Sequence, residues 1–85
     1  FDQSIADYTE AIRIAPKNSS WYYSRGIVLG LNGETDKAIH DFTHAIRLAP
    51  KFADAFQFRG WCHEKKGDTA AANADFKKAK ELGYK

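Results

Sequence analysis

The sequence contains little that would add covalent or strongly electrostatic constraints. Cys62 is its single cysteine, so the chain cannot form an internal disulfide, and nothing indicates an oxidising compartment. A formal charge of only +2 arises from 13 basic and 11 acidic side chains, unlike the basic surface of a nucleic-acid-binding protein. No apolar run approaches the roughly 20 residues that cross a bilayer. We therefore expect a soluble, cytoplasmic protein that binds neither nucleic acid nor membrane.

The chain is also short and has only two prolines among its 85 residues. A closed globular core of this size would bury only about 60–65% of the unfolded surface. Because 44% of the residues are hydrophobic and 28% are charged, the composition is globular and favours stacked helices. The sequence begins at Phe1, without a methionine, inside a pattern that already predicts a helix. We expect that it belongs to a longer array.

The chain repeats itself with a step of 34 residues. The segment 7–17 recurs as 41–51 and, more weakly, as 75–85, where Tyr84 replaces the proline of the earlier copies. The upstream halves agree as well, because Tyr22, Arg25, Gly26 and Ala38 recur as Phe56, Arg59, Gly60 and Ala72. Such a period indicates stacked copies of one supersecondary unit.

Each unit has the pattern of two helices joined by a turn. Apolar residues recur at spacings of one, three and four, as in Ala38, Ile39, Phe42, Ala45, Ile46 and Ala49, which is one face of an α-helix. Helices are predicted at 2–14, 20–31, 36–48, 54–65 and 70–82. Gly33 and Gly67 suit the positive φ of helix C-caps, and Pro16 and Pro50 end their helices. Possible N-caps are Thr35, Asp36, Asp68 and Thr69.

These residues resemble the tetratricopeptide repeat family over essentially the whole chain. The family pattern is carried by an aromatic residue with glycine four positions later (Tyr22/Gly26, Phe56/Gly60), the turn glycines, Ala38 and Ala72, Phe42 and Phe76, Ala45 and Ala79, and Pro50. The resemblance implies an all-α fold, a right-handed α-solenoid of antiparallel helix pairs with five helices. It divides residues 1–85 into a half repeat at 1–18, holding only a second helix, and full repeats at 19–52 and 53–85.

By this resemblance, the first helix of each pair lines a concave groove. The helix at 20–31 carries a second apolar row, Tyr23, Ile27 and Leu31, beside its packing stripe. The helix at 54–65 presents Phe58 and Trp61 with polar neighbours. Aromatic anchors with a polar rim are typical of protein interfaces. We predict a site for an amphipathic or extended protein segment, formed by Tyr23, Ile27, Leu31, Asp54, Gln57, Phe58, Trp61 and Lys65.

Two alternatives remain open. The first is self-association into a homo-oligomer through the groove row and through Ile5, Tyr8 and Ile12, which we expect on the face that meets a preceding helix. The second is docking within a longer enzyme. Acidic chaperone tails, which some members of the family bind with cationic side chains, are not expected, because the comparable places hold Ser20, Ser24, Ile27, Asp54 and Phe58.

No residue pattern predicts catalysis, a cofactor or a metal. His40 and His44 lie four apart on one helix, but no third ligand follows, so a solvated face is expected. Cys62 and His63 are consecutive, so their side chains point about 100° apart on a helix. They are therefore not expected to act as a nucleophile and its base. We expect both to be packing residues. Lysines near the C-terminus are interspersed with acidic residues and are expected to face solvent.

Overall fold

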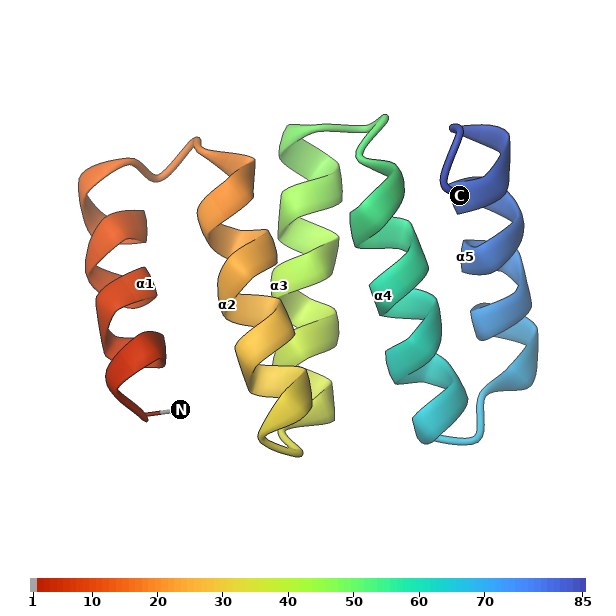
Figure 1. Ribbon diagram of the computed structural model, residues 1–85, viewed down its shortest axis with the longest axis horizontal. Helices are drawn as coiled ribbons and strands as arrows, with labels where there is room; N and C mark the ends of the chain where they lie inside the picture. Colours follow the sequence, from red (N-terminus) through yellow and green to blue (C-terminus); the bar gives the residue numbers. More distant parts are fainter. Residues whose placement is uncertain (1) are drawn as a thin grey trace.

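Five antiparallel helices make up the chain in a computed structural model, which describes residues 2–85 (Figure 1). They are α1 (Asp2–Ile14), α2 (Ser19–Leu31), α3 (Thr35–Leu48), α4 (Ala53–Lys65) and α5 (Thr69–Glu81), and they stand side by side in chain order. Each helix has 13 or 14 residues, and none within 2–85 has the length and apolar character needed to cross a membrane. The predicted all-α helical repeat fold is confirmed, with helix ends shifted by at most one residue.

The turns follow the predicted glycines closely. Gly33 and Gly67 both have φ of +84°, a left-handed conformation that a side chain would strain. Asp68 caps α5, because its Oδ1 accepts a hydrogen bond from the Ala71 amide at 3.1 Å. The predicted capping of α3 by Thr35 or Asp36 is wrong: both lie inside α3, and the helix starts after Glu34 with no side-chain cap.

Small residues allow the two helices of each pair to approach closely. A Cβ atom added at Gly26 would lie 2.8 Å from the Phe42 ring, and one added at Gly60 would lie 2.9 Å from the Phe76 ring. Both distances are shorter than real carbon contacts, so the α2–α3 and α4–α5 pairs require glycine at these crossings. Ala38, Ala45, Ala72 and Ala79, at the same interfaces, are at most 1% exposed.

Each helix pair also contains an ion pair in its interior. Arg25 of α2 donates two hydrogen bonds to the Asp41 carboxylate of α3, at 2.7 and 2.8 Å, and one to Thr9 of α1 at 3.2 Å. The hydrogen bond to Asp41 raises the pKa of the Arg25 guanidinium. The next unit repeats this network with Arg59, Asp75 and Thr43. Three successive helices are thus joined by one arginine, which fixes their register.

The first helix contacts only α2 among the other described helices. Ile5 and Ile12 pack against the core beside α2, and the Tyr8 ring lies 6.2 Å from that of Trp21. The prediction that Ile5, Tyr8 and Ile12 lie on the face that meets a preceding helix is therefore wrong for Ile5 and Ile12. Ile5 and Ile12 belong to the side of α1 that meets α2, whereas Tyr8 has the repeat position of Phe42, whose ring meets Gly26 of its preceding helix.

Candidate protein-binding groove

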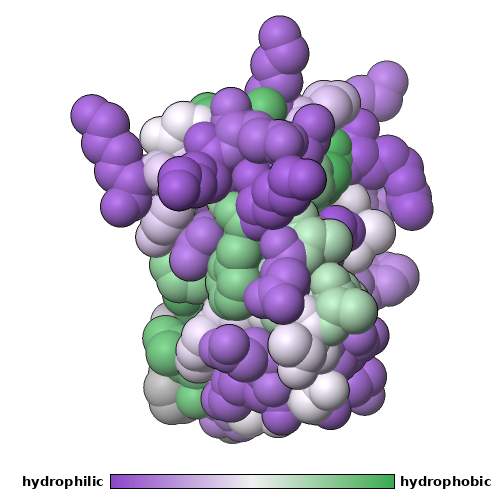
Figure 2. Space-filling view, turned by 90° about the vertical axis from the view of Figure 1, so that its right-hand side faces the viewer, coloured by the Kyte–Doolittle hydropathy of each residue, from purple (hydrophilic) through white to green (hydrophobic). Residues whose placement is uncertain are grey.

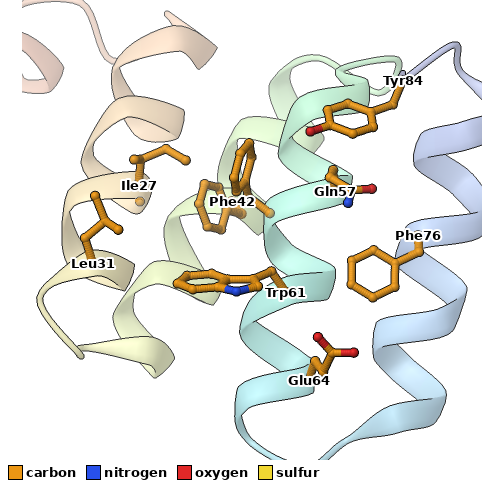
Figure 3. A pocket seen from close by; sticks show the side chains of 10 residues that line it. Ile27, Leu31, Phe42, Gln57, Trp61, Glu64, Phe76 and Tyr84 are labelled. Atoms are coloured by element: carbon orange, nitrogen blue, oxygen red, sulfur yellow. The ribbon is translucent and has the colours of Figure 1, made fainter.

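The first helices of consecutive pairs, α2 and α4, border a hollow of about 340 Å³ (Figure 3). Its wall is largely apolar and includes parts of α3, α5 and the C-terminal segment. The lining residues are Gly26, Ile27, Leu31, Phe42, Gln57, Phe58, Trp61, Glu64, Phe76 and Tyr84. Five of the eight predicted binding residues, namely Ile27, Leu31, Gln57, Phe58 and Trp61, are therefore brought together.

Trp61 spans the space between the two helices. Its indole extends from α4 toward α2, below Ile27 and Leu31 as seen in Figure 3. It lies close to Gly30 of α2, where an added Cβ atom would be 3.3 Å from the indole Cζ3. The missing side chain at Gly30 therefore allows the indole to lie close to the α2 backbone. This packing restricts the indole while leaving it half-buried at the edge of the hollow.

Charged and apolar groups lie side by side at the end of the groove near the α4 C-terminus. The ammonium group of Lys65 lies 4.4 Å from the centroid of the Trp61 ring, a cation–π arrangement. Glu64, on the same turn, lines the hollow. Leu31 is 62% exposed, which is unusual for a large aliphatic side chain beside an apolar hollow. The site thus combines an apolar floor with a charged rim.

Three predicted residues lie outside the lining: Lys65, whose ammonium group lies over the Trp61 ring, and Tyr23 and Asp54. The Tyr23 ring packs against Phe58 with a centroid distance of 6.1 Å, and against Phe52 at 4.8 Å. Burial raises the pKa of the Tyr23 phenol, and the nearby Asp54 carboxylate raises it further. Tyr23 therefore packs against Phe58 without lining the hollow itself, whereas Asp54 is exposed close to the N-terminus of α4.

Sequence reasoning did not include Tyr84 in the site. The chain turns back after α5 at Gly83, which has φ of +98°, and the Tyr84 amide donates to the Ala79 carbonyl at 2.9 Å. This turn places the Tyr84 side chain beside Gln57 (Figure 3). No pattern could have indicated it, because the repeat has proline at this place. Phe42 and Phe76 were assigned only to packing, yet each also lines the hollow.

His44, His63 and Cys62 are packed against other side chains. His44 stacks on Tyr22, with ring centroids 4.1 Å apart and planes 7° apart, so the expected solvated face is wrong for His44. Cys62 is 0% exposed in the core, and burial raises the pKa of its thiol to about 11. His63 lies 3.8 Å from the Asp75 carboxylate. Within residues 2–85, no three His, Cys, Asp or Glu side chains are grouped as metal ligands.

The α5 end of the molecule is polar around a central apolar strip. Figure 2 views this end, and hydrophilic side chains project from much of its surface. Lys77, Lys78 and Lys80 are exposed on α5, as is Glu81. None of these four residues is among those that line the hollow between α2 and α4.

The family model for the tetratricopeptide repeat matches residues 21–52 and 53–82. Together with the paired helices and the 34-residue period, this match shows that the chain belongs to the tetratricopeptide repeat family. The family consists of helical scaffolds for protein interaction, and that general class of function applies here. Where each repeat begins and ends along the chain stays a prediction.

The solved structures similar to this chain include several of MamA. Two crystal structures of MamA share 36% sequence identity with it, with TM-scores of 0.89 and 0.86; each match covers 92% of this chain but only 46% and 43% of the MamA chains. MamA from Desulfovibrio magneticus RS-1 is 25% identical, with a TM-score of 0.84 over 88% of this chain and 42% of that one. The chain thus spans less than half of these relatives. A search of curated proteins finds no significant match.

Proposed function

We propose that the groove between α2 and α4 binds another protein by accepting one of its segments, extended or amphipathic, anchored by large apolar side chains. The observation that carries this proposal is the clustering of Ile27, Leu31, Phe58 and Trp61 around one open hollow. Half-buried aromatic side chains in a pocket with a polar rim are the residues that contribute most of the free energy of protein binding.

The size of the hollow limits what can enter it. Its volume of about 340 Å³ lies at the lower end of the range of about 300–1,000 Å³ that holds small ligands. It therefore suits one or two anchor side chains of a segment whose backbone lies across the surface. The Gln57 side chain has both a donor and an acceptor and can bond to that backbone.

The charges at the two ends of the groove would set the direction of the bound segment. Asp54 lies near the N-terminus of α4, whereas Lys65 is near its C-terminus, beside Trp61. A segment with a basic residue at one end and an acidic residue at the other would match this order. A highly acidic tail without apolar anchors would leave the hollow unfilled, so we propose no such partner.

Selection from a displayed library of random peptides tests the proposal without a known partner. Peptides retained by the chain should carry aromatic or large aliphatic residues. We expect Trp61→Ala to raise the dissociation constant of a selected peptide about 30-fold, as central aromatic anchors do. Trp21→Ala is the matched control, because Trp21 packs toward Tyr8 of α1 and not toward the hollow. Equal affinity of the wild-type and Trp61→Ala chains would contradict the proposal.

Sedimentation equilibrium separates peptide binding from self-association. The chain alone should keep one mass over a wide range of concentrations and gain only the mass of the selected peptide. A dimer that forms without peptide and that disappears with Trp61→Ala would mean that the groove is instead an interface between copies.

A further inference from the structure

A second hollow, of about 420 Å³, is lined by α1, α2 and α3. Arg25 and Leu29 of α2 border it. Each of them lies two positions before a residue that lines the groove, and therefore points to nearly the opposite side of the helix. We call this space the α1–α3 hollow. Its lining residues are Ile5, Thr9, Arg25, Leu29, Glu34, Lys37, His40 and Asp41.

The polar groups that this hollow offers to a ligand are mainly hydrogen-bond donors. A guanidinium group has five N–H bonds, and Arg25 uses three of them, two on Asp41 and one on Thr9. Among residues 2–85, one hydrogen therefore stays available on each of its two terminal nitrogens. The Asp41 side chain is only 3% exposed, and the Glu34 carboxylate already accepts a hydrogen bond from Lys37 at 3.2 Å. The hollow thus offers more donors than acceptors.

Two basic side chains at the rim distinguish this hollow from the corresponding part of the next unit. Lys37 and His40 are exposed on α3, one turn apart, and both line the hollow. One repeat further along the chain, their positions hold Ala71 and Ala74. The network of arginine, aspartate and threonine is nevertheless the same in both units. The packing of a unit therefore does not require the two basic groups.

We propose that the α1–α3 hollow binds a glutamate side chain of a partner protein. Its carboxylate accepts hydrogen bonds from the two remaining N–H groups of Arg25, and Lys37 and His40 stabilise its charge from the rim. The two methylene groups of the glutamate pack against Ile5 and Leu29, the aliphatic residues of the lining. Hydrogen bonding and charge therefore favour a carboxylate over an amide or a basic group.

A protein is a better source of this carboxylate than a free acid, because the rim of the hollow is open. Thr9, Lys37 and His40 are all exposed, so a small acid would remain largely in water, where ion pairs contribute little. A side chain held on a partner backbone adds contacts of that backbone with α1 and α3. The α1–α3 hollow would thus give this scaffold a second binding surface, separate from the groove between α2 and α4.

An NMR titration with N-acetyl-glutamate amide tests the chemistry of the hollow. This probe has one glutamate side chain between two peptide groups, and we expect a dissociation constant of about 1–10 mM for a ligand of its size. At constant pH and ionic strength, the Arg25 Nε–H signal should shift and reach saturation. The Arg59 Nε–H signal is the internal control, because Arg59 has the same kinds of partner without the basic rim. The indole N–H signal of Trp61 should stay in place.

Matched probes and variants separate the effect of charge from that of shape. N-Acetyl-glutamine amide has the same shape without the charge and should bind about fivefold more weakly. Lys37→Ala combined with His40→Ala should weaken binding of the glutamate probe about threefold. Both alanines already occur at the corresponding positions of the next unit, so the fold should be retained. Lys78→Ala is the control, because it removes an exposed lysine of α5 that does not line the hollow.

Four results would overturn the proposal. The first is the lack of a saturable shift of the Arg25 signal, and the second is equal affinity for the glutamate and glutamine probes or for the wild-type chain and the double variant. The third is an equal shift of the Arg25 and Arg59 signals, which would indicate a general effect of ions. The fourth is tighter binding of butyrate than of the glutamate probe, which would replace the protein partner by a free aliphatic acid. Because Trp61 reports on the groove separately, the proposal stands or fails independently of the proposed groove function.

Discussion

The aspartates at one position of the repeat should differ in their effect on stability according to their burial and their partners. Asp7, Asp41 and Asp75 share one position of the repeat, yet only the last two pair with an arginine. We take Asp41→Asn as the perturbation, because asparagine preserves the shape of the side chain and removes its charge. The Asp41 side chain is 3% exposed, and that of Arg25 is 22% exposed.

The expected loss of unfolding free energy lies between the losses for breaking a buried and a surface ion pair. Breaking a fully buried pair costs about 3–5 kcal/mol, whereas an exposed pair contributes about 0–1 kcal/mol. Because Arg25 keeps part of its hydration, we expect Asp41→Asn to lower the free energy of unfolding by about 2 kcal/mol. For a domain of this size, that corresponds to a fall in melting temperature on the order of 10 °C.

Urea unfolding followed by far-ultraviolet circular dichroism measures this change. Asp7→Asn is the matched control and should stay within about 0.5 kcal/mol of the wild type, as exposed substitutions do. Arg25→Gln combined with Asp41→Asn should cost less than the sum of the two single changes, because the two side chains act as one pair. An equal effect of Asp7→Asn and Asp41→Asn, or strict additivity, would refute the reasoning.

Two further predictions concern packing and the buried thiol. Gly26→Ala should destabilise by about 1–3 kcal/mol, since its Cβ would meet the fully buried Phe42 ring at 2.8 Å. Gly30→Ala should be nearly neutral in thermal melting but weaken peptide binding, because its Cβ would be tight only against the half-buried Trp61, at 3.3 Å, and would make ordinary contacts with Ala38 and Cys62. Equal melting temperatures of the two variants would contradict this. Cys62 should react with iodoacetamide far more slowly in the folded chain than in urea, because the thiol is buried with a pKa of about 11. Because the folded state raises this pKa, the neutral thiol contributes to stability in full at pH values below 9.0, the ordinary pKa of a thiol. This contribution is lost as the pH rises toward the folded-state pKa of about 11. Rapid alkylation of the folded chain near neutral pH would show that Cys62 is accessible.

Much of the fold could be predicted from the sequence because the residues that each helix crossing and turn requires recur at a step of 34 residues. Gly26 and Gly60 each face the ring of an aromatic residue on the next helix, which fills the space that a glycine side chain leaves empty. Gly33 and Gly67 both adopt the predicted positive φ. The start of α3 was misplaced by one residue, because Thr35 and Asp36 are good caps by composition, whereas Glu34 occupies the cap position without a side-chain hydrogen bond to the helix amides.

The ion pairs were missed although the sequence contained their signal. Thr9, Arg25 and Asp41 recur as Thr43, Arg59 and Asp75, and identical polar residues at one period indicate a repeated contact as clearly as apolar ones do. Helical periodicity places Ile5 and Ile12 on one face, but it does not say which neighbour covers that face. That choice depends on the tertiary arrangement, which is why Ile5 and Ile12 were assigned to the wrong side of α1.

Helical spacing also explains why part of the groove could be predicted from the sequence. Spacing along α2 and α4 identifies the rows that face it, so Ile27, Phe58 and Trp61 could be found from the sequence. Tyr84 reaches the hollow through a turn after α5, and neither the repeat nor the helical period specifies where such a segment lies.

The chain has only two tryptophans, and this allows one direct test of the groove. In a proton–nitrogen correlation spectrum, the indole N–H signals of Trp61 and Trp21 report on the hollow and on the α1–α2 contact, respectively. Titration with a peptide selected on the chain should shift the Trp61 signal and leave that of Trp21 in place. A shift of Trp21 with an unchanged Trp61 signal would contradict binding in the groove between α2 and α4.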